Sequence, residues 1–320
     1  MRSMPPSPPP DAAGAVRGTR AAGATPTDPA HEAPGGARGW RDDPERVRPV
    51  VLVIGGFLTS PPLYWHLRRR LLRRGAADVL IAPIWLPDWI LAAVRGLGPI
   101  ATRAGRSLLR AGERSAVSPQ ARGAPVMVVG HSAGGVVARL LTSPEPFEGR
   151  RLDASGRIGA IVSLGSPHRV SGHHGERRAG RASAFAERVV PGARFAPTTG
   201  YLSVMSRHVV GDPSGDGRQQ TAHRLYRQLH GPGRPDGEPD RPIEGDGLIP
   251  LSSARLPGAL EIVLDDAIHG QLAGEPWYGV DEMLDRWWPP AVEVWRSALR
   301  ARVAAAAGSA PGDERATALA

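Results

Sequence analysis

The sequence of 320 residues contains no cysteine and no lysine. Without cysteine, disulfide bonds, thiolate nucleophiles and cysteine-based zinc sites are excluded. Without lysine, arginine supplies every basic side chain, and the formal net charge is +9. The arginines form short groups such as 68–70 and 177–178, and no nucleic-acid-binding motif accompanies them. We therefore expect a solvated basic surface and no nucleic-acid partner, with a basic nucleic-acid binder as the less favoured alternative.

Long apolar runs are also missing. No stretch approaches the roughly 20 apolar residues of a membrane span. The first ten residues are polar and rich in proline, and no apolar run of signal-peptide length follows them. These absences predict a cytoplasmic protein. A transient contact with a membrane surface stays open as a partner interaction.

Glycine and proline are abundant, with 40 and 33 residues, and they gather at one end of the chain and in its loops. Residues 1–46 have few large apolar groups and cannot bury enough surface to offset the entropy of ordering, so they are predicted to form a disordered arm. Residues 303–320 resemble a second, flexible tail. The folded domain is thus expected at 47–302.

Within that domain, short apolar runs alternate with segments of helical pattern. The runs are bounded by glycine or proline and are rich in β-branched residues, as buried parallel strands are. The alternation predicts an α/β fold with a mostly parallel central sheet and helices on both faces. The strand candidates are 50–54, 79–84, 126–129, 158–163, 201–210 and 262–264, and the helix candidates are 62–74, 90–113, 135–141 and 218–230.

The strongest motif is the G-x-S-x-G run at 130–134, which lies between a predicted strand and a predicted helix. Such a turn exposes the serine hydroxyl at the edge of the sheet, and small residues must stand two positions before and after the serine. Gly130 and Gly134 meet this need, so Ser132 is the candidate nucleophile. An ordinary glycine-rich turn is the alternative.

A hydrolase of this kind needs backbone donors for the oxyanion. The first predicted strand ends at Gly55-Gly56-Phe57, where two glycines allow the backbone to turn close to the nucleophile. The backbone N–H groups of Phe57 and Ala133 are therefore the expected pair of donors. A plain strand-to-helix connection is the alternative.

A serine at its ordinary pKa needs a general base. In hydrolases with a G-x-S-x-G turn between strand and helix, the chain order is serine, acid, histidine. His269 follows the last predicted strand and is the candidate base. His168, at the end of another strand, is expected to line the site without transferring protons. His173 and His174 could ligate a metal together with His168, but a solvated loop is the favoured interpretation, and neither a metal nor a cofactor is expected.

The candidate acid is Asp246, which stands on a glycine-flanked loop between the serine and the base. Such a carboxylate fixes the imidazole tautomer and stabilises the imidazolium. Asp265 and Asp266 are rivals, but they share a short segment with the base and are expected not to reach its far nitrogen. Asp212 and Asp216 stand closer to a predicted strand end and remain alternatives.

Together these motifs resemble the lipase and esterase branch of the α/β-hydrolases. The resemblance covers about 47–290 and is closest to lipase-like proteins related to the GPI inositol-deacylase group. It rests on GHSAGG at 130–135, IGGF at 54–57, GSPH at 165–168, GDGLIPLSSA at 245–254, IH at 268–269, Asp88-Trp89, and PWYGVD at 276–281. The chain departs from the family in having Gly55-Gly56 where many lipases have His-Gly. The resemblance implies an α/β-hydrolase fold and a Ser132–Asp246–His269 triad.

The expected reaction is hydrolysis of a carboxylic ester, with an apolar acyl ester of a small molecule or lipid as substrate. The segment 168–200 is long for a connection and is predicted to form a small cap insertion. An acyltransferase or thioesterase with the same triad is the neighbouring alternative, and a non-enzymatic binding module of this fold is the less favoured one. The residues expected to line the substrate site are Leu58, Trp85, Trp89, His131 and His168.

Overall fold

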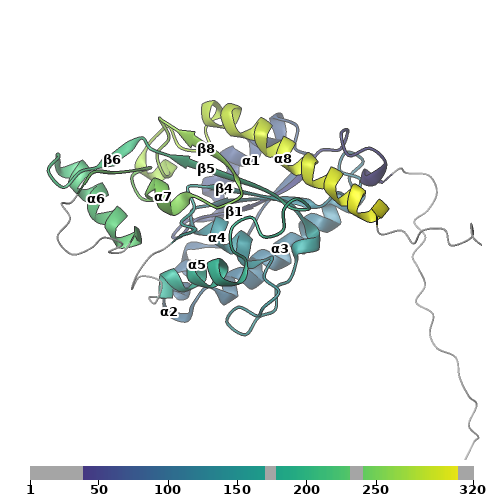
Figure 1. The fold of residues 1–320 in the computed structure, drawn as a ribbon, viewed down its shortest axis with the longest axis horizontal. Helices are drawn as coiled ribbons and strands as arrows, with labels where there is room; N and C mark the ends of the chain where they lie inside the picture. Colours follow the sequence, from purple (N-terminus) through teal and green to yellow (C-terminus); the bar gives the residue numbers. More distant parts are fainter. Residues whose placement is uncertain (1–38, 170–177, 231–240, 309–320) are drawn as a thin grey trace, which may run out of the picture. The chain divides into compact units, whose positions relative to one another are not determined.

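The computed structural model describes residues 39–169, 178–230 and 241–308. Its centre is a six-stranded sheet with the order β2-β1-β3-β4-β5-β8 (Figure 1). Every neighbouring pair of strands is parallel. The predicted α/β fold with a parallel central sheet is therefore confirmed. The strands are β1 (Val50–Ile54), β2 (Asp78–Ile81), β3 (Val126–His131), β4 (Ile158–Leu164), β5 (Gly200–Ser206) and β8 (Leu260–Leu264).

Helices cover both faces of this sheet (Figure 1). One face packs against α1 and α8, and the other packs against α3 and α4, with α2 and α5 outside them. Two apolar clusters, one on each side, fill the space between sheet and helices. The helices are α1 (Trp65–Arg73), α2 (Leu86–Arg95), α3 (Gly98–Val117), α4 (Ala133–Leu140), α5 (Arg178–Val189), α6 (Gly217–His230), α7 (Leu251–Ala254) and α8 (Asp281–Gly308).

The central strands are buried along their whole length, because helices cover both of their sides. All residues of β1, β3 and β4 are buried. Continuous Val, Ile and Leu runs suit such strands, since neither face of the sheet meets water. The edge strand β8 is largely exposed or half-buried and is correspondingly more mixed in sequence.

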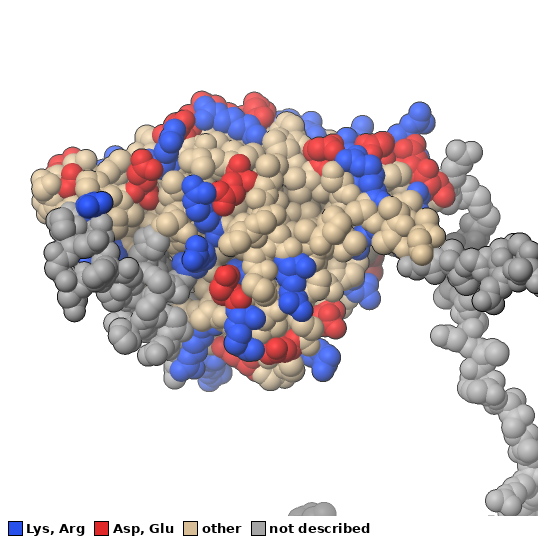
Figure 2. All heavy atoms as spheres, in the orientation of Figure 1, with Lys and Arg blue, Asp and Glu red and all other residues tan. Residues whose placement is uncertain are grey.

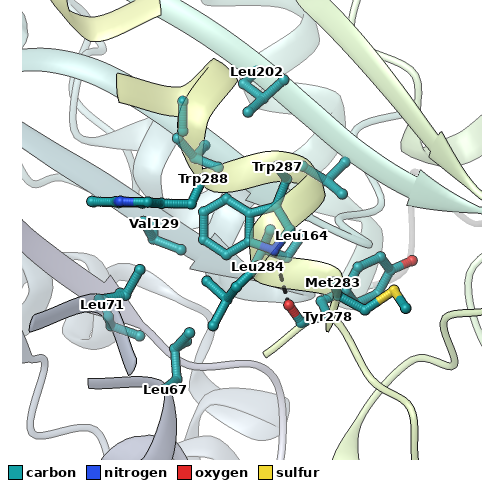
Figure 3. Packing of buried hydrophobic residues seen from close by; sticks show 14 of the residues in the cluster. Leu67, Leu71, Val129, Leu164, Leu202, Tyr278, Met283, Leu284, Trp287 and Trp288 are labelled. Atoms are coloured by element: carbon teal, nitrogen blue, oxygen red, sulfur yellow. Dashed lines mark hydrogen bonds between the residues drawn. The ribbon is translucent and has the colours of Figure 1, made fainter. Parts of the chain in front are cut away.

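Helix α8 closes one face of the sheet with a row of tryptophans. Trp287, Trp288 and Trp295 recur at helical spacing and are all buried. Figure 3 shows Trp287 and Trp288 among leucines from α1 and from the sheet, with the indole N–H of Trp287 donating to the carbonyl of Tyr278 at 2.9 Å. The helix reaches Gly308, beyond the start of the tail predicted at 303.

Two predicted elements are divided in the structure. The predicted helix 90–113 is interrupted at Gly96, whose φ of 94° ends α2 before α3 begins. The predicted strand 201–210 supplies β5 and then a separate strand, β6 (Val209–Gly211). Strand β6 pairs antiparallel with β7 (Ile243–Gly245), outside the main sheet. This pair of strands lies next to α6, which stands between them in the sequence (Figure 1).

The packed part of the chain begins before residue 47. Trp40 is buried, and its backbone N–H donates to the carbonyl of Arg122 at 3.2 Å. Of the predicted arm, residues 39–46 therefore belong to the domain, while 1–38 lie outside the described residues. An apolar indole in a mostly polar segment was the signal for this contact.

The described part of the predicted cap segment lies on a helical face of the domain. Helix α5 packs against α4, with Ala182 and Ala186 buried beside Val136 and Leu140. The stretch 170–177 lies outside the described residues.

The surface is mixed in charge. Figure 2 shows arginine and acidic side chains interspersed over the face in view. Many of them pair, as Arg74 does with Asp285 at 2.7 Å and Arg286 with Asp266 at 2.8 Å. None of the helices in the described part of the chain has the length and hydropathy of a membrane span.

Candidate active site

Ser132 occupies a strained turn between β3 and α4. Its φ of 53° and ψ of −126° are unfavourable for a residue with a side chain. The turn persists because α4 begins very close to β1: a Cβ at Gly134 would collide with the carbonyl oxygen of Ile54. The backbone N–H of Ser132 also donates to the carbonyl of Leu164 at 2.9 Å. The predicted strand–turn–helix context of the G-x-S-x-G run is therefore present.

The loop after β1 lies directly against this serine. A Cβ at Gly56 would stand 2.8 Å from Cβ of Ser132, so only glycine fits there. The next residue, Phe57, and the first residue of α4, Ala133, both have backbone N–H groups without a hydrogen-bond acceptor among the described residues. The N–H at the start of a helix has no partner within the helix. Both N–H groups are therefore candidates for the predicted pair of oxyanion donors.

His269 and Asp246 meet beside the serine. The Nδ1 atom of His269 lies 2.8 Å from Oδ2 of Asp246, and the backbone N–H of His269 donates to the carbonyl of Asp246 at 2.9 Å. Asp246 directly follows β7, so the antiparallel β6–β7 pair positions the acid. The candidate acid does follow a strand, but one outside the main sheet.

Four hydrogen bonds hold the Asp246 carboxylate. Oδ1 accepts from the backbone N–H groups of Leu248 at 3.0 Å and Ile249 at 2.7 Å. Oδ2 accepts from His269 and from the hydroxyl of Tyr278 at 2.9 Å. Burial raises the pKa of this carboxyl, but His269 and the backbone donors outweigh burial and hold the pKa below its usual value. The acid is therefore ionised in the folded protein at neutral pH.

His131, directly before Ser132, is buried between the segment of His269 and the segment of Tyr64. Its Nε2 lies 2.7 Å from the carbonyl oxygen of His269, and its Nδ1 lies 2.9 Å from the hydroxyl of Tyr64. Burial, with a smaller contribution from His269, lowers the pKa of His131 to about 3. The ring is consequently neutral near pH 7.

A cavity of about 850 Å³ opens over Ser132 and His269. Its size lies within the range of small-molecule binding sites. Apolar side chains from the β1 loop, from β6 and α6, and from the segment around His269 line most of it. These are Leu58, Leu63, Val209, Ala222, Leu248, Ile268, Leu272 and Trp277.

Of the five predicted substrate-lining residues, the structure brings Leu58 and His131 to the cavity. Trp89 is instead fully buried and packs edge-on against Phe57, and Trp85 is half exposed at the start of α2. His168 is also fully buried and is not among the residues lining the cavity. The sequence indicated on which edge of the sheet these residues stand, but not the direction in which each side chain points.

Helix α6 contributes Arg218, Thr221 and Ala222 to the cavity wall. None of the described residues of the predicted cap segment 168–200 lines this cavity.

The rival acids have other partners. Asp265 pairs with Arg207, and Asp266 pairs with Arg286. In the same way Asp212 accepts from Ser214 at 2.8 Å, while Asp216 accepts from the backbone N–H of Gln219 at the start of α6. None of them contacts His269 in the described structure.

Three aromatic residues of the site were missed at the level of sequence. Tyr278 bonds the acid, Tyr64 bonds His131, and Trp277 packs edge-on against His131 with ring centroids 5.6 Å apart. Trp277 and Tyr278 belong to the PWYGVD run, whose resemblance to the family was a usable signal. Tyr64 had none. Among the described residues, no group of His, Asp and Glu is placed to hold a metal ion.

Comparison with known proteins finds no matching family model and no matching curated protein. Solved structures similar to this chain include a dienelactone hydrolase from Anabaena variabilis, with 15% identity over 79% of this chain and 87% of that chain and a TM-score of 0.39. Est1E from Butyrivibrio proteoclasticus has 11% identity over 80% and 90%, with a TM-score of 0.38. A monoacylglycerol lipase from Paleococcus ferrophilus has 10% identity over 79% and 96%, with a TM-score of 0.38. With such low TM-scores, these likenesses indicate no substrate for this chain.

Acid should destabilise the fold through His131. The unfolded chain binds a proton at this residue below about pH 6.5, whereas the folded protein does not until about pH 3. The contribution of His131 to the free energy of unfolding is therefore fully present above pH 6.5. It is lost as the pH drops, by up to about 1.4 kcal/mol per pH unit. Urea unfolding between pH 7 and pH 4.5 should show a smaller decline in His131→Gln than in the wild type.

The matched control is His66→Gln, which removes an exposed imidazole from α1 and should keep the decline of the wild type. His168, whose pKa burial also lowers, continues to contribute in all three proteins. Equal pH dependence of stability in the wild type and His131→Gln would contradict the lowered pKa of His131.

Proposed function

We propose that this protein is a serine hydrolase that cleaves carboxylic esters, with Ser132 as nucleophile, His269 as base and Asp246 as the acid that orients the base. The observation that carries the proposal is the 2.8 Å contact between His269 Nδ1 and a buried, ionised Asp246 beside the strained turn of Ser132. Ser132 and His269 line the same cavity, so a bound ester can reach both.

In the proposed reaction, Ser132 Oγ attacks the ester carbonyl carbon while its proton passes to Nε2 of His269. The carbonyl oxygen becomes an oxyanion, which the N–H groups of Phe57 and Ala133 stabilise. The tetrahedral intermediate then expels the alcohol, which takes the proton from His269. Water attacks the acyl-enzyme in the same way, and its proton travels through His269 to Ser132 Oγ as the carboxylic acid leaves. Asp246 stays ionised throughout.

The apolar wall of the cavity supports an apolar acyl ester of a small molecule or lipid as the substrate class. Leu58, Leu248 and Leu272 are 47%, 36% and 77% exposed, and burying them against an acyl chain gains free energy. An acyltransferase or thioesterase would use the same three residues, and a panel of esters and thioesters separates these reactions.

Within the lipase and esterase branch, we propose a relationship to the lipase-like proteins of the GPI inositol-deacylase group. The two runs that suggest it have defined positions in the structure. Asp88 accepts from the backbone N–H of Trp85 at the start of α2 and pairs with Arg103. In the second run, Tyr278 bonds Asp246 and Asp281 pairs with arginines of α1 and its C-terminal end.

The first test is labelling by a fluorophosphonate probe. Intact mass should show one adduct on the wild type and none on Ser132→Ala, because the probe reacts with an activated serine. The same pair of proteins, assayed on p-nitrophenyl esters of graded chain length, should show turnover only in the wild type. Ser107→Ala, which removes a buried hydroxyl from α3 away from the cavity, is the control for loss of a serine. Labelling of Ser132→Ala would refute the assignment of the nucleophile.

A second test concerns the acid. Asp246→Asn should lower kcat by orders of magnitude, since the amide favours the wrong imidazole tautomer; the protease example that defines this effect loses about 10⁴. Asp266→Asn, whose carboxylate pairs with Arg286 on the surface, should leave kcat near that of the wild type. Near-normal turnover in Asp246→Asn would move the role to another carboxylate, and Asp212→Asn and Asp216→Asn would then be assayed.

Contact with a lipid surface is the remaining proposal. The outer face of α2 exposes Leu86, Ile90 and Val94 at successive helical turns, with exposed fractions of 41%, 55% and 63%. Trp89, on the inner face of α2, packs on Phe57 of the cavity lining, so the helix that bears this apolar face also contacts the site. An apolar surface of this kind favours transient binding to lipid aggregates.

Co-sedimentation with vesicles of phosphatidylcholine and phosphatidylglycerol tests this contact. The double variant Ile90→Glu, Val94→Glu should bind fewer vesicles while it hydrolyses a soluble short-chain ester at the wild-type rate. Val117→Glu, at the exposed end of α3, is the matched control for adding a carboxylate to an apolar surface position. Unchanged sedimentation of the double variant would remove α2 from the proposal.

A further inference from the structure

A buried chain of hydrogen bonds runs between the loop after β1 and the backbone of His269. The backbone N–H of Gly56 donates to the hydroxyl oxygen of Tyr64 at 2.8 Å. That hydroxyl lies 2.9 Å from Nδ1 of His131, and Nε2 of His131 lies 2.7 Å from the carbonyl oxygen of His269. The chain therefore connects the two sides of the proposed site behind Ser132.

The carbonyl acceptor at one end sets the protons that satisfy every bond of this hydrogen-bond chain. A carbonyl oxygen accepts but never donates, so Nε2 of His131 must hold the proton that bonds His269. Nδ1 of the neutral ring is then an acceptor, and the Tyr64 hydroxyl must donate to it. The nearest other acceptor for that hydroxyl, Oγ1 of Thr59, is 3.3 Å away and donates its own proton to the carbonyl of Gly56.

The chain is rigid because it is buried. Tyr64 and His131 are 2% and 5% exposed. The ring of Trp277 stands edge-on to both, with centroids 6.2 Å from Tyr64 and 5.6 Å from His131. Neither ring can turn without losing one of these hydrogen bonds, and an unpaired buried polar group costs about 1–3 kcal/mol.

We propose that Tyr64 and His131 are positioning residues that hold the oxyanion-binding loop at a fixed place relative to the base. The inference rests on the proposed hydrolase function. Gly56 immediately precedes Phe57, whose N–H is a proposed oxyanion donor, so fixing Gly56 fixes that donor. At the other end, the bond to the His269 carbonyl fixes the backbone that bears the imidazole. His131 is also covalently joined to Ser132, so one side chain relates nucleophile, base and donor.

Kinetics of Tyr64→Phe tests this role. The variant keeps the ring but removes the hydroxyl, which leaves Gly56 and Nδ1 of His131 without partners. We expect kcat on a soluble p-nitrophenyl ester to fall about 10- to 100-fold, since small displacements of reacting groups have effects of this size, while KM changes less than about 3-fold. Tyr201→Phe removes a buried phenol hydroxyl from β5, away from the cavity, and should keep the wild-type kcat.

A double-mutant cycle separates positioning from simple destabilisation. His131→Gln breaks the same chain one link further on, so Tyr64→Phe in that background should lower kcat no further than about 2-fold. If the two substitutions acted independently, their fold-reductions in kcat would instead multiply, which means that their free-energy effects would add. Additive losses, or a Tyr64→Phe enzyme whose kcat stays within 2-fold of the wild type while Ser132→Ala is inactive, would overturn the inference and leave the proposed function standing.

A readout without turnover keeps the two proposals distinguishable. Nitrogen-15 NMR of the wild-type protein should show His131 as a neutral ring protonated at Nε2 from pH 8 to pH 5, and Tyr64→Phe should shift the signal of Nδ1. A proton on Nδ1 in the wild type would disprove the hydrogen-bond chain, whether or not the protein hydrolyses esters. If the probe fails to label Ser132 while His131 has the predicted tautomer, the hydrolase function is overturned. The hydrogen-bond chain then exists but has no role in catalysis.

Discussion

The close approach of α4 to the end of β1 is the constraint on which the site depends. Gly134 lies against the carbonyl of Ile54, and Gly56 lies against Ser132, so the strained turn and the loop that faces it are held by direct backbone contact. A strained serine of this kind persists only where its surroundings over-determine it. Gly56 follows the fully buried strand β1, and Gly134 lies in the first turn of α4, directly after β3. The geometry of the turn therefore follows from the packing of the sheet.

Much of the fold is readable from the sequence because burial on both faces leaves a simple pattern. The run 50–54 matches β1 residue for residue, and the G-x-S-x-G run stands where the pattern predicted. Patterns fail where one residue decides a boundary. A single glycine with positive φ, Gly96, splits the predicted helix 90–113, and a change of sheet divides the predicted strand 201–210.

The proposed triad, Ser132, Asp246 and His269, could be read from sequence because each residue belongs to a local motif. The residues around them could not. Tyr64 and His131 are 67 positions apart, and no periodicity relates them. Direction was equally hidden: Trp89 turns into the core, whereas Trp85, four residues earlier, stays half exposed. Long-range hydrogen bonds and side-chain direction depend on tertiary packing, which a single sequence does not display.

The acid and one wall of the cavity come from the same insert between β5 and β8. Val209 and Ala222 line the cavity, and Asp246 stands in the loop that follows β7 of that insert. The hydroxyl of Tyr226, on α6, ties these parts together by donating to the carbonyl of Val209 and accepting from the N–H of Gly247. A substitution that reshapes this wall would therefore disturb the carboxylate of Asp246 at the same time. The architecture thus couples the shape of this part of the cavity to the placement of Asp246, whereas Ser132 is held by the packing of α4 against the sheet.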